Sequence, residues 1–491
     1  MENIKIYNTL TRKKEPLTTL TEGNIKMYTC GQTVYNHIHM GNARFYVVYD
    51  AIRRYLEHRG HNVSYVQNFT DIDDKTIQRA KEEGISTLEI AEKYIASTLT
   101  DLQNLNVKPA TVNPRVTEEI PEIVAMVQQL VDSNHAYENS GTVYFDVTSF
   151  SGYGKLSKKN IDNLEAGARV EVEAGKKNPM DFVLWKPAKP DEPSWPSPWG
   201  NGRPGWHIEC SAMIRKYLGD QIDIHGGGTD LIFPHHENEI AQSEAVTGKN
   251  FANYWMHCGM ITVDHKKMSK SRGNFATLQE VAEKFPYDVI RFFFLSVHYR
   301  MPMEFTDTVL QAAQQGLSRI KTCLTNLHHK AENAESEPIT PTETSLLQEA
   351  ETFRRNFETA MDDDFNTADA ITAIFELVKF ANVCMAKDES YTKEFLTRLA
   401  EQINDLCEIL GIFFILPFSR DIRMSIGAKV TLSVLTKEEV AEREEINALV
   451  EARQAAKKAK DFVEADRIRN QLTEMGIVLE DTREGVRWHR A

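Results

Sequence analysis

Long apolar runs are absent from this chain of 491 residues. No stretch approaches the roughly 18 consecutive apolar residues that a membrane helix needs, so we expect no membrane partner. The first residues, Met1 to Glu15, mix charges with short apolar pieces and lack the apolar core and cleavage site of a secretory signal. Together these absences predict a cytoplasmic protein.

Cysteine is scarce as well. The six cysteines are spread along the chain, at Cys30, Cys210, Cys258, Cys323, Cys384 and Cys407. Such sparse spacing excludes a disulfide framework and leaves reduced thiols or metal ligands. The last four have apolar neighbours in the sequence, so we interpret them as packing residues.

Positive charge is outnumbered by negative charge. The chain has 57 Lys and Arg residues against 71 Asp and Glu residues, which gives a formal net charge of -14. This balance argues against nucleic-acid binding driven by bulk charge. Any polynucleotide partner must therefore be met by a local basic surface.

The length exceeds what one hydrophobic core supports, so we expect several domains. An apolar run at Ile25–Thr29 leads into a loop at Cys30–Met40, a helical pattern at Gly41–His58 and a β-rich run at Asn62–Asn68. Such strand, helix, strand units usually form right-handed crossovers in a parallel sheet and bind ligands where strands end. The first loop is therefore a predicted site.

The middle of the chain interrupts this alternation and then resumes it. A helical pattern at Thr117–Ser133 and a strand pattern at Gly141–Phe150 predict an insertion, and the prolines of Pro187–Trp206 predict a loop without regular structure. The second half of the sheet should follow as a strand, a helix and a strand at Gln221–His225, Glu237–Val246 and Tyr254–Cys258.

The remainder is mainly helical. After about Gln314, apolar residues recur at four-residue steps and predict a helical bundle, as at Phe353, Phe357 and Met361 or at Phe395, Leu399 and Ile403. The polar segment Lys330–Thr344 is the predicted linker into the bundle, and Pro417–Thr436 separates the bundle from a small terminal unit.

The predicted fold class is α/β. A Rossmann-like parallel-sheet catalytic domain is expected in two halves, residues 1–115 and 201–260, with an α+β insertion at residues 116–200. Three further units should follow, namely a lysine-rich loop region at 261–330, the α-helical bundle at 331–416 and a carboxy-terminal α/β unit at 417–491.

The predicted first loop carries a motif for phosphate binding. His39, Met40, Gly41 and Asn42 directly precede the helical pattern. The glycine lets a phosphate approach the backbone, a helix amino terminus favours anions, and His39 and Asn42 can donate hydrogen bonds. The alternative is a turn followed by a helix cap.

A second motif lies far downstream, at Lys266, Lys267, Met268, Ser269, Lys270, Ser271 and Arg272. Alone, it could be a solvated basic loop. In this order, however, His-x-Gly-Asn and Lys-Met-Ser-Lys-Ser resemble the two signatures of class I aminoacyl-tRNA synthetases. Asn42 stands where the class most often has histidine, which keeps a hydrogen-bond donor but removes a titratable group.

The resemblance implies amino-acid activation by Mg-ATP, in which the amino-acid carboxylate attacks the α-phosphate. The protein then positions groups and stabilises charge, and no protein nucleophile is needed. By resemblance, His39, Gly41 and Asn42 would meet the phosphates, and Lys267 and Lys270 would neutralise the departing pyrophosphate.

Several segments resemble cysteinyl-tRNA synthetase specifically. They are Cys30–Gly31, Asn68–Lys75, Gly205–Met213, His225–Asp230, Phe233–Glu239 and Asp364–Thr367, so the resemblance spans nearly the whole chain. It implies one zinc ion per chain, held by Cys30, Cys210, His235 and Glu239, which recognises the thiol of the substrate L-cysteine.

The residues themselves support that metal set only weakly. His235 and Glu239 are four apart and share one face of a predicted helix, while Cys30 and Cys210 are expected to end separate sheet elements. Two sulfur, one nitrogen and one oxygen donor suit tetrahedral zinc, although no Cys-x-x-Cys pair is present. Zinc would discriminate cysteine from serine, which pocket contacts separate poorly.

The resemblance also implies a cysteine pocket at Cys30, Thr70, Trp206 and His225. A core tryptophan, a turn threonine and a strand-end histidine are the alternatives for the last three. Gly227, Gly228 and Asp230 would lie on the adenosine or substrate side, where glycines permit close approach.

For tRNA, the resemblance implies that the bundle contacts the stem and that the terminal unit reads the anticodon. Residues 451–491 hold nine Lys or Arg against eight Asp or Glu, which is less acidic than the whole chain. The candidate contacts are Lys457, Lys458 and Lys460 for phosphates and Arg487 with Trp488 for an unpaired base. A charged surface helix and a frayed tail are the alternative.

The resemblance thus implies a cysteine–tRNA ligase that forms cysteinyl-adenylate and transfers cysteine to the terminal adenosine of tRNA(Cys). One rival is the related ligase that joins cysteine to an amino sugar in mycothiol synthesis, although the residues after about Thr344 argue against it. Another is a catalytically inactive tRNA-binding protein, against which both ATP signatures argue. No feature requires a dimer, so we expect a monomer.

Overall fold

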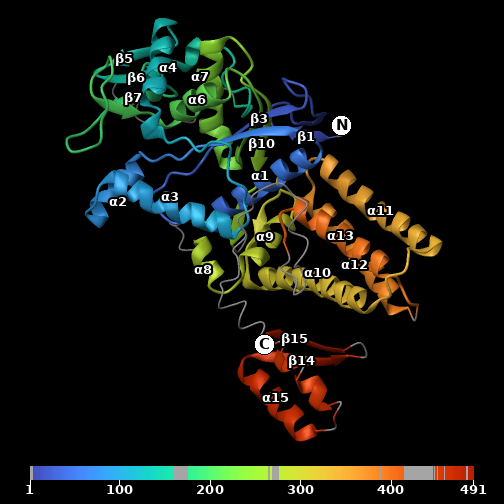
Figure 1. Cartoon of the computed structure of the whole chain (residues 1–491). Coiled ribbons are helices and arrows are strands. Elements are labelled where there is room, and N and C mark those ends of the chain that lie inside the picture. Colours follow the sequence, from blue (N-terminus) through green and yellow to red (C-terminus); the bar gives the residue numbers. More distant parts are fainter. Residues whose placement is uncertain are drawn as a thin grey trace.

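A parallel sheet of four strands, in the order β10-β9-β3-β4, forms the centre of the computed structural model (Figure 1). Its strands are β3 (Asn24–Thr29), β4 (Asn62–Gln67), β9 (Ile222–Gly228) and β10 (Ala252–Cys258). The structure describes residues 4–159, 175–263, 266–267, 276–387, 389–413, 446, 448–450, 452–457, 459, 461–482 and 485–490. The predicted α/β class and parallel sheet are confirmed.

The first crossover follows the prediction closely. Helix α1 (Met40–His58) joins β3 to its parallel neighbour β4. Most of α1 is buried, including Tyr49 and Ile52, because the sheet and the later helix α9 (Tyr287–Leu295) pack against it. A short antiparallel hairpin, β1 (Lys5–Asn8) and β2 (Lys13–Pro16), lies beside β10.

Two helices and an insertion separate the halves of the sheet. Helices α2 (Asp74–Glu83) and α3 (Thr87–Asn104) follow β4. The insertion then contains the 3-10 turn η1 (Val116–Glu118), helix α4 (Ile120–Asp132), the 3-10 turn η2 (Val147–Ser149) and an antiparallel sheet of β5 (Ala136–Asn139), β6 (Thr142–Phe145), β7 (Phe182–Pro187) and β8 (Gly202–Pro204).

Two sequence expectations for the insertion need correction. The predicted strand Gly141–Phe150 ends at Phe145, where the chain turns into η2. The prediction of no regular structure over Pro187–Trp206 is wrong at Gly202–Pro204, which pairs with β7 as β8. Pro204 is tolerated because it is the last residue of an edge strand.

The second half of the sheet is framed by helices. Helix α6 (Trp206–Tyr217) precedes β9 and α7 (Glu237–Thr247) follows it after the turns η3 (Thr229–Leu231) and η4 (Ile232–His236). The chain then continues through β11 (Ile261–Val263), β12 (Lys266–Lys267) and the short helix α8 (Leu278–Ala282) to α9. The strand β13 (Met303–Glu304) follows α9 and pairs with β11.

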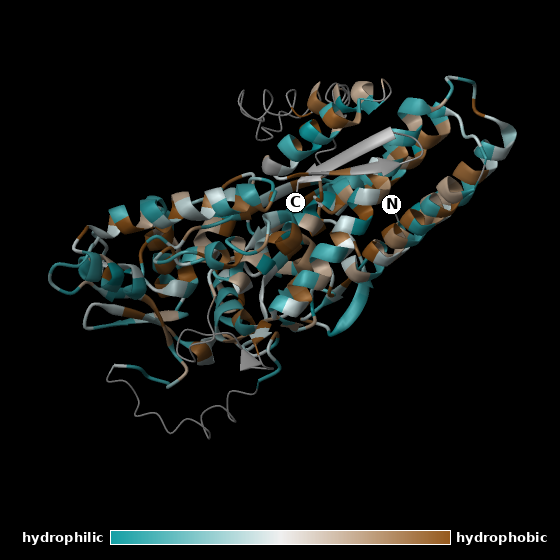
Figure 2. Cartoon of the chain, turned by 90° about the horizontal axis from the view of Figure 1, so that it is seen from below, coloured by the Kyte–Doolittle hydropathy of each residue, from teal (hydrophilic) through white to brown (hydrophobic). Residues whose placement is uncertain are grey.

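The helical bundle consists of α10 (Asp307–Asn333), α11 (Pro341–Asp362), α12 (Thr367–Ala386) and α13 (Lys393–Ile409). Apolar residues alternate with polar ones along these helices in Figure 2, and the predicted core residues Phe357, Leu399 and Ile403 are fully buried. Helix α10 packs on α12 and α13 and extends to Asn333, so the predicted linker Lys330–Thr344 is shorter than expected.

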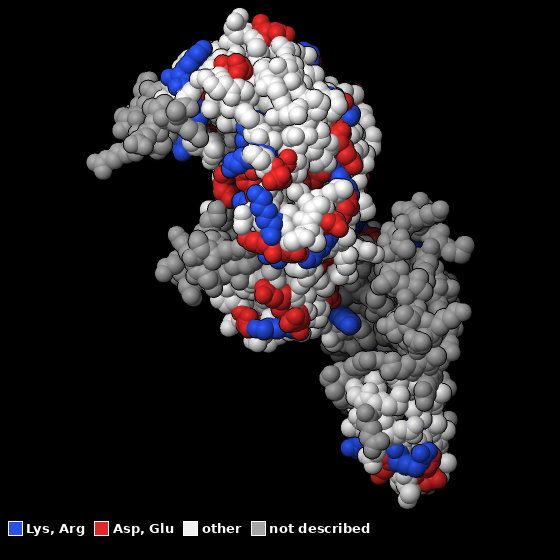
Figure 3. Space-filling view, turned by 90° about the vertical axis from the view of Figure 1, so that its left-hand side faces the viewer, with Lys and Arg blue, Asp and Glu red and all other residues white. Residues whose placement is uncertain are grey.

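A small unit follows, with α15 (Phe462–Glu474), β14 (Ile477–Thr482) and β15 (Gly485–Arg490). It has its own core, which includes Val450, Ile468, Leu472 and Ile477. Among the described helices, none is long and apolar enough to cross a membrane. On the described part of the face drawn in Figure 3, Lys and Arg residues are interspersed with Asp and Glu residues.

Candidate active site and metal centre

A cavity of about 320 Å³ opens at the carboxyl ends of β3, β9 and β10. Among its lining residues are seven of the predicted site residues, which are Cys30, His39, Gly41, Asn42, Trp206, Gly228 and Asp230. The ends of parallel strands are where the crossover rule places ligands, and this cavity lies at that edge of the sheet.

The phosphate motif begins helix α1. His39 is the N-cap residue, and its Nδ1 accepts a hydrogen bond from the backbone N–H of Asn42 at 3.2 Å. At Gly41, a Cβ would lie 2.8 Å from the His39 ring, so only glycine leaves this turn unobstructed. The helix amino terminus therefore faces the cavity, and the positive end of its dipole favours anions there.

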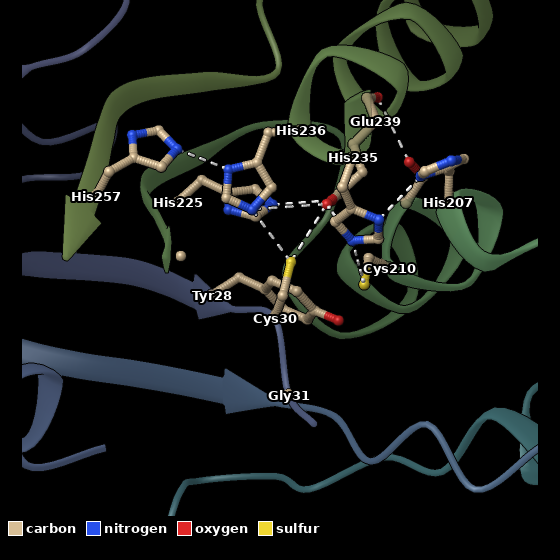
Figure 4. A network of polar contacts seen from close by, with 12 residues as sticks. Tyr28, Cys30, Gly31, His207, Cys210, His225, His235, His236, Glu239 and His257 are labelled. Atoms are coloured by element: carbon tan, nitrogen blue, oxygen red, sulfur yellow. Dashed lines mark hydrogen bonds and ion pairs between the residues drawn. The ribbon is translucent and has the colours of Figure 1, made fainter. Parts of the chain in front are cut away.

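The four predicted metal ligands meet beside this cavity. Cys30, Cys210, His235 and Glu239 are buried, and their ligand atoms all lie within 4.8 Å of one another (Figure 4). His235 Nε2 lies 3.0 Å from Glu239 Oε1 and 3.7 Å from Cys210 Sγ. Cys30 Sγ lies 3.3 Å from the same Glu239 oxygen. The structure thus brings together four residues spread over the first half of the sequence.

A second set of possible ligands shares part of this cluster. Cys30 and Glu239 also group with His225 and His236, again with ligand atoms within 4.8 Å of one another. His236 Nε2 lies 3.3 Å from Cys30 Sγ, and His225 Nε2 lies 2.8 Å from Glu239 Oε2. Cys30 and Glu239 therefore stand between two groups of histidine and cysteine donors.

The histidines around the cluster are held by further contacts. His236 Nδ1 lies 2.9 Å from Nε2 of His257, whose Nδ1 lies 2.8 Å from the Thr9 hydroxyl. The His225 ring stacks on Trp255 with centroids 4.4 Å apart. Such outer contacts fix ring orientation and leave the inner nitrogen facing the cluster.

Burial and mutual contact shift the pKa values in this cluster. Burial raises the pKa of Cys30 well above its ordinary value. A hydrogen bond from Cys30 is the largest cause that lowers the pKa of Cys210, to about 6. Burial alone would lower the pKa of His235, but the charges and hydrogen bonds of Glu239 and Cys210 outweigh it and raise that pKa to about 10.

The carboxyl of Glu239 also has a shifted pKa. Burial by itself raises its pKa, but His225 and His235 outweigh burial and hold the pKa well below its ordinary value. The cluster therefore concentrates negative charge on Glu239 and Cys210 in a place without solvent. A buried anionic group of sulfur, nitrogen and oxygen donors suits a divalent cation, which can replace the protons that the ligands share.

The loop that carries Cys30 is fixed by an amide side chain. Asn68 Oδ1 accepts hydrogen bonds from the Gly31 backbone N–H at 2.8 Å and from the Tyr28 hydroxyl at 3.0 Å. At Gly31, an added Cβ would lie 1.5 Å from the Asn68 carbonyl oxygen. Glycine is therefore required for the loop to pass so close to the end of β4.

One local expectation about the cluster is wrong. Cys210 does not end a sheet element but lies inside helix α6, while Cys30 directly follows β3 as expected. Helix α6 packs against α7, which carries Glu239, and this packing brings Cys210 to the other ligands. Contact between two helices cannot be inferred from the spacing of single cysteines.

Three of the residues predicted for the cysteine pocket and the adenosine side are not among those that line the cavity, namely Thr70, His225 and Gly227. The Thr70 hydroxyl donates a hydrogen bond to Glu209 at 3.3 Å, and His225 contacts the metal cluster. At Gly227, an added Cβ would lie 2.3 Å from the His236 ring. The strand end is thus packed directly on the histidines.

Several predicted residues fall outside the described part of the chain. Lys270, Lys458 and Lys460 are not described, and Lys267, Arg487 and Trp488 are described only as backbone in β12 and β15. Lys457 is described and exposed. The roles predicted for these residues stay predictions.

Sequence reasoning missed His236, His257 and Asn68 as parts of the site. His236 follows His235 directly in the sequence, and this pair of histidines was the one local signal for it. His257 is near the end of β10 and meets His236 only because β10 and β9 are neighbours. Its position depends on strand order, for which the sequence carries no local signal.

Three family models match the chain. Residues 16–315 match the catalytic domain of class I (C) tRNA synthetases. Residues 356–414 match the DALR domain, and residues 441–488 match the cysteinyl-tRNA ligase anticodon binding domain.

Similar proteins cover the same extent. A cysteine–tRNA ligase of Lachnoclostridium phytofermentans is 53% identical over 493 residues, covering 99% of this chain and 100% of that protein. Another from Lachnospira eligens is 52% identical over 495 residues, with the same coverage. A solved methionyl-tRNA synthetase of Mycobacterium tuberculosis has a TM-score of 0.57 at 15% identity, covering 79% of this chain and 89% of that one, and supports the fold alone.

Proposed function

The chain belongs to the cysteine–tRNA ligases of the class I tRNA synthetase family, and we propose that its buried cluster holds the zinc ion that recognises substrate cysteine. As a class I synthetase it uses ATP, and its anticodon binding domain makes tRNA a partner. The four ligands of the proposed zinc site are Cys30, Cys210, His235 and Glu239.

The single observation that carries this proposal is the fit of the donor atoms. Tetrahedral zinc with bonds of about 2.0–2.3 Å needs ligand atoms about 3.3–3.8 Å apart. The separations of Cys210 from His235 and of Cys30 from Glu239, 3.7 and 3.3 Å, lie in this range, and that of His235 from Glu239 is slightly shorter at 3.0 Å. The set with two cysteines is preferred over the set with His225 and His236 because two thiolates suit zinc better than one.

Zinc binds a thiolate far more readily than a neutral hydroxyl, so the bound ion would favour cysteine over serine. The chain's own residues supply the surroundings. Trp206, whose ring centroid lies 4.2 Å from that of His235, forms the wall between the metal cluster and the open part of the cavity. Thr70 donates a hydrogen bond to Glu209, which lies on the same helix as Trp206.

We assign the phosphate-binding role to the start of α1. His39, Gly41 and Asn42 line the cavity, and their helix terminus would stabilise the charge that develops on the α-phosphate of Mg-ATP. Gly227, Gly228 and Asp230 would accept the adenosine side, and Lys267 and Lys270 the pyrophosphate. No protein nucleophile is required, because the cysteine carboxylate itself attacks the phosphorus atom.

For the remaining partners, we propose that tRNA(Cys) contacts the helical bundle and presents its anticodon to residues 417–491, with Lys457, Lys458, Lys460, Arg487 and Trp488 as contacts. We also propose the domain division given by the sequence, with α10 added to the bundle because it packs on α12 and α13. We further propose a cytoplasmic monomer. The match of residues 441–488 to an anticodon binding domain favours tRNA over an amino sugar as the acceptor.

The experiment that tests this proposal is cysteine-dependent exchange of labelled pyrophosphate into ATP. Exchange is expected with cysteine, should be far weaker with serine, and should fall after exhaustive zinc removal and return when zinc is restored. Charging of purified tRNA(Cys) is then measured with the same enzyme. Exchange that is equal for cysteine and serine, or that survives complete zinc removal, would contradict the proposed role of the metal.

A further inference from the structure

Helix α3 carries a polar stripe that contacts residues lining the cavity. Tyr94, Ser97, Thr98 and Asp101 are spaced by three, one and three residues and so share one face of the helix. Tyr94, Thr98 and Asp101 are at most 1% exposed. Buried polar side chains are costly unless they find partners, so their contacts indicate what the helix positions.

The first group of partners lies on the loop that follows β3. Gln32 Nε2 donates a hydrogen bond to the Thr98 hydroxyl at 2.5 Å, and His37 Nδ1 lies 2.7 Å from the Ser97 hydroxyl. The His37 ring also meets the Tyr94 ring edge-on, with centroids 5.3 Å apart. Gln32 and His37 both line the cavity. The stripe therefore fixes the loop that leads into the phosphate motif.

The second group of partners comes from α8 and α9. Gln279 Nε2 donates to the Ser97 hydroxyl at 3.0 Å and to Asp101 Oδ2 at 3.2 Å. The Tyr287 hydroxyl donates to the other oxygen of Asp101 at 2.9 Å. Ser97 is thus shared, because one hydroxyl contacts both His37 and Gln279.

The same two segments also meet through their backbones. The Met40 N–H donates to the Ala276 carbonyl at 3.2 Å, and the Leu278 N–H donates to the Ile38 carbonyl at 2.9 Å. These bonds place His39 opposite Thr277 in an antiparallel bridge. In the sequence, Ala276 follows the Lys-Met-Ser-Lys-Ser motif by only a few residues.

We propose that Gln279 is a positioning residue for adenylate formation, which holds the segment after the second ATP motif at a fixed place against the first through Ser97 and Asp101 of α3. This inference rests on the proposed activation of cysteine by ATP. It adds a residue that belongs to neither signature and does not contact the metal cluster.

Gln279 would fix the position of the segment after the second ATP motif relative to the first motif. The backbone bridge holds two segments together at one point, and two short stretches joined at one point can still pivot. The Gln279 amide adds a second point of attachment, to a helix whose same buried face also packs through Ile90 and Tyr94 in an apolar cluster with Phe69. Small displacements of positioned groups are expensive in catalysis, since roughly 1 Å can cost about a hundredfold in rate.

The test is steady-state exchange kinetics on full-length Gln279→Ala and Ser97→Ala. Both variants should raise the KM for ATP or slow exchange by roughly ten- to a hundredfold. The KM for cysteine, the zinc content and the melting temperature should stay at wild-type values. Gln128→Ala is the matched control, because Gln128 makes the same kind of side-chain bond, to Asp132, on the exposed face of α4.

Exchanging the amide and the carboxylate between positions 279 and 101 distinguishes loss of this hydrogen bond from a general disturbance of the structure. Gln279→Glu alone places a carboxylate against Asp101 and should impair exchange more than Gln279→Ala does. Combining it with Asp101→Asn restores a donor and an acceptor at the same place, so the double variant should recover most of the lost rate.

The outcomes distinguish this inference from the proposed function. If the wild-type enzyme shows no cysteine-dependent exchange, the proposed function itself fails. If the wild type is active but Gln279→Ala matches it, or impairs cysteine and ATP use equally, the positioning role is wrong. A double variant that recovers nothing also overturns the assigned contact.

Discussion

At the scale of single residues, the metal cluster offers two overlapping ligand sets that share Cys30 and Glu239. They differ in Cys210 with His235 on one side and His225 with His236 on the other. Shared ligands cannot decide between them, so the residues outside the overlap are the informative ones.

We predict that Cys210→Ser abolishes stoichiometric zinc binding, whereas His236→Gln retains about one ion per chain. Loss of one thiolate removes a ligand, while loss of an outer contact typically weakens metal affinity only about 10- to 100-fold. Zinc per chain is measured by mass spectrometry on folded protein. Retained zinc in Cys210→Ser together with its loss in His236→Gln would assign the metal to the other set. Cys258→Ser is the control, since Cys258 is buried but belongs to neither set.

The sequence could identify the ligands only through resemblance to a family. Cys30 follows a strand and Cys210 lies in a helix, and neither has a cysteine neighbour at metal-binding spacing. Their meeting depends on how α6 packs on α7, which is a property of the whole fold. The phosphate-binding motif could be predicted from the sequence itself, because its glycine turn and its helix start are adjacent in the chain.

At the scale of elements, helices were predicted better than their ends. The linker Lys330–Thr344 was predicted too long because Pro341 and the polar residues around it are typical of a break. In the structure, Pro341 is the first residue of α11, where its fixed backbone angle and missing N–H are tolerated. Thr340 and Glu343 then form a capping box, for which Thr-x-x-Glu was the available signal.

Glu343 joins two helices of the bundle. Its carboxylate accepts a hydrogen bond from the Thr340 N–H at 2.7 Å, which caps α11. Its other oxygen accepts one from the N–H of Thr392, the N-cap residue of α13, at 2.6 Å. Glu343 is only 3% exposed and Thr392 is buried, so removal of the carboxylate leaves the Thr392 N–H without a partner away from solvent and uncaps α11 at Thr340.

We therefore predict that Glu343→Ala lowers the free energy of unfolding of the bundle by about 2–3 kcal/mol. Urea unfolding followed by circular dichroism measures this change. Glu349→Ala, an exposed substitution in the same helix, should stay within about 0.5 kcal/mol of wild type. Equal stability of the two variants would show that the double cap contributes nothing.

At the scale of the whole molecule, the net charge was the weakest basis for predicting a nucleic-acid partner. A value of -14 argued only against bulk attraction to nucleic acid, and the anticodon domain match shows that a tRNA partner is still met. Described charges of both signs are mixed on the face drawn in Figure 3. Overall charge influences solubility and association, whereas the packing of domains on one another depends on particular buried pairs.

One such pair connects the catalytic domain to the bundle. Asp50 of α1 lies 2.5 Å from Arg291 of α9 and 2.8 Å from Arg54. Arg291 also donates to the carbonyl oxygens of Leu105, after α3, and Leu410, after α13, both at 2.9 Å. Asp50 and Arg291 are at most 2% exposed, so this contact joins four helices away from solvent.

The pKa of Asp50 gives this contact a definite pH dependence. Burial alone raises that pKa, but the charges of Arg291 and Arg54 outweigh burial and hold it below its ordinary value. A carboxyl with a lowered pKa in the folded state stabilises the protein fully above its unfolded-state pKa of about 3.9. The stabilisation is lost as the pH falls through the folded-state pKa.

We predict that Asp50→Asn lowers the unfolding free energy at pH 7 by about 3–5 kcal/mol, because it leaves buried guanidinium groups without their anion. The difference from wild type should shrink as the pH falls below about 4, where wild-type Asp50 becomes protonated as well. Asp405→Asn is the matched control, since its ion pair with Arg354 is exposed and should contribute at most about 1 kcal/mol. The test is to measure the unfolding free energies of wild type, Asp50→Asn and Asp405→Asn from pH 7 to below about 4. A difference that is independent of pH would mean that Asp50 acts through shape alone, because only the charged carboxylate loses its contribution in acid.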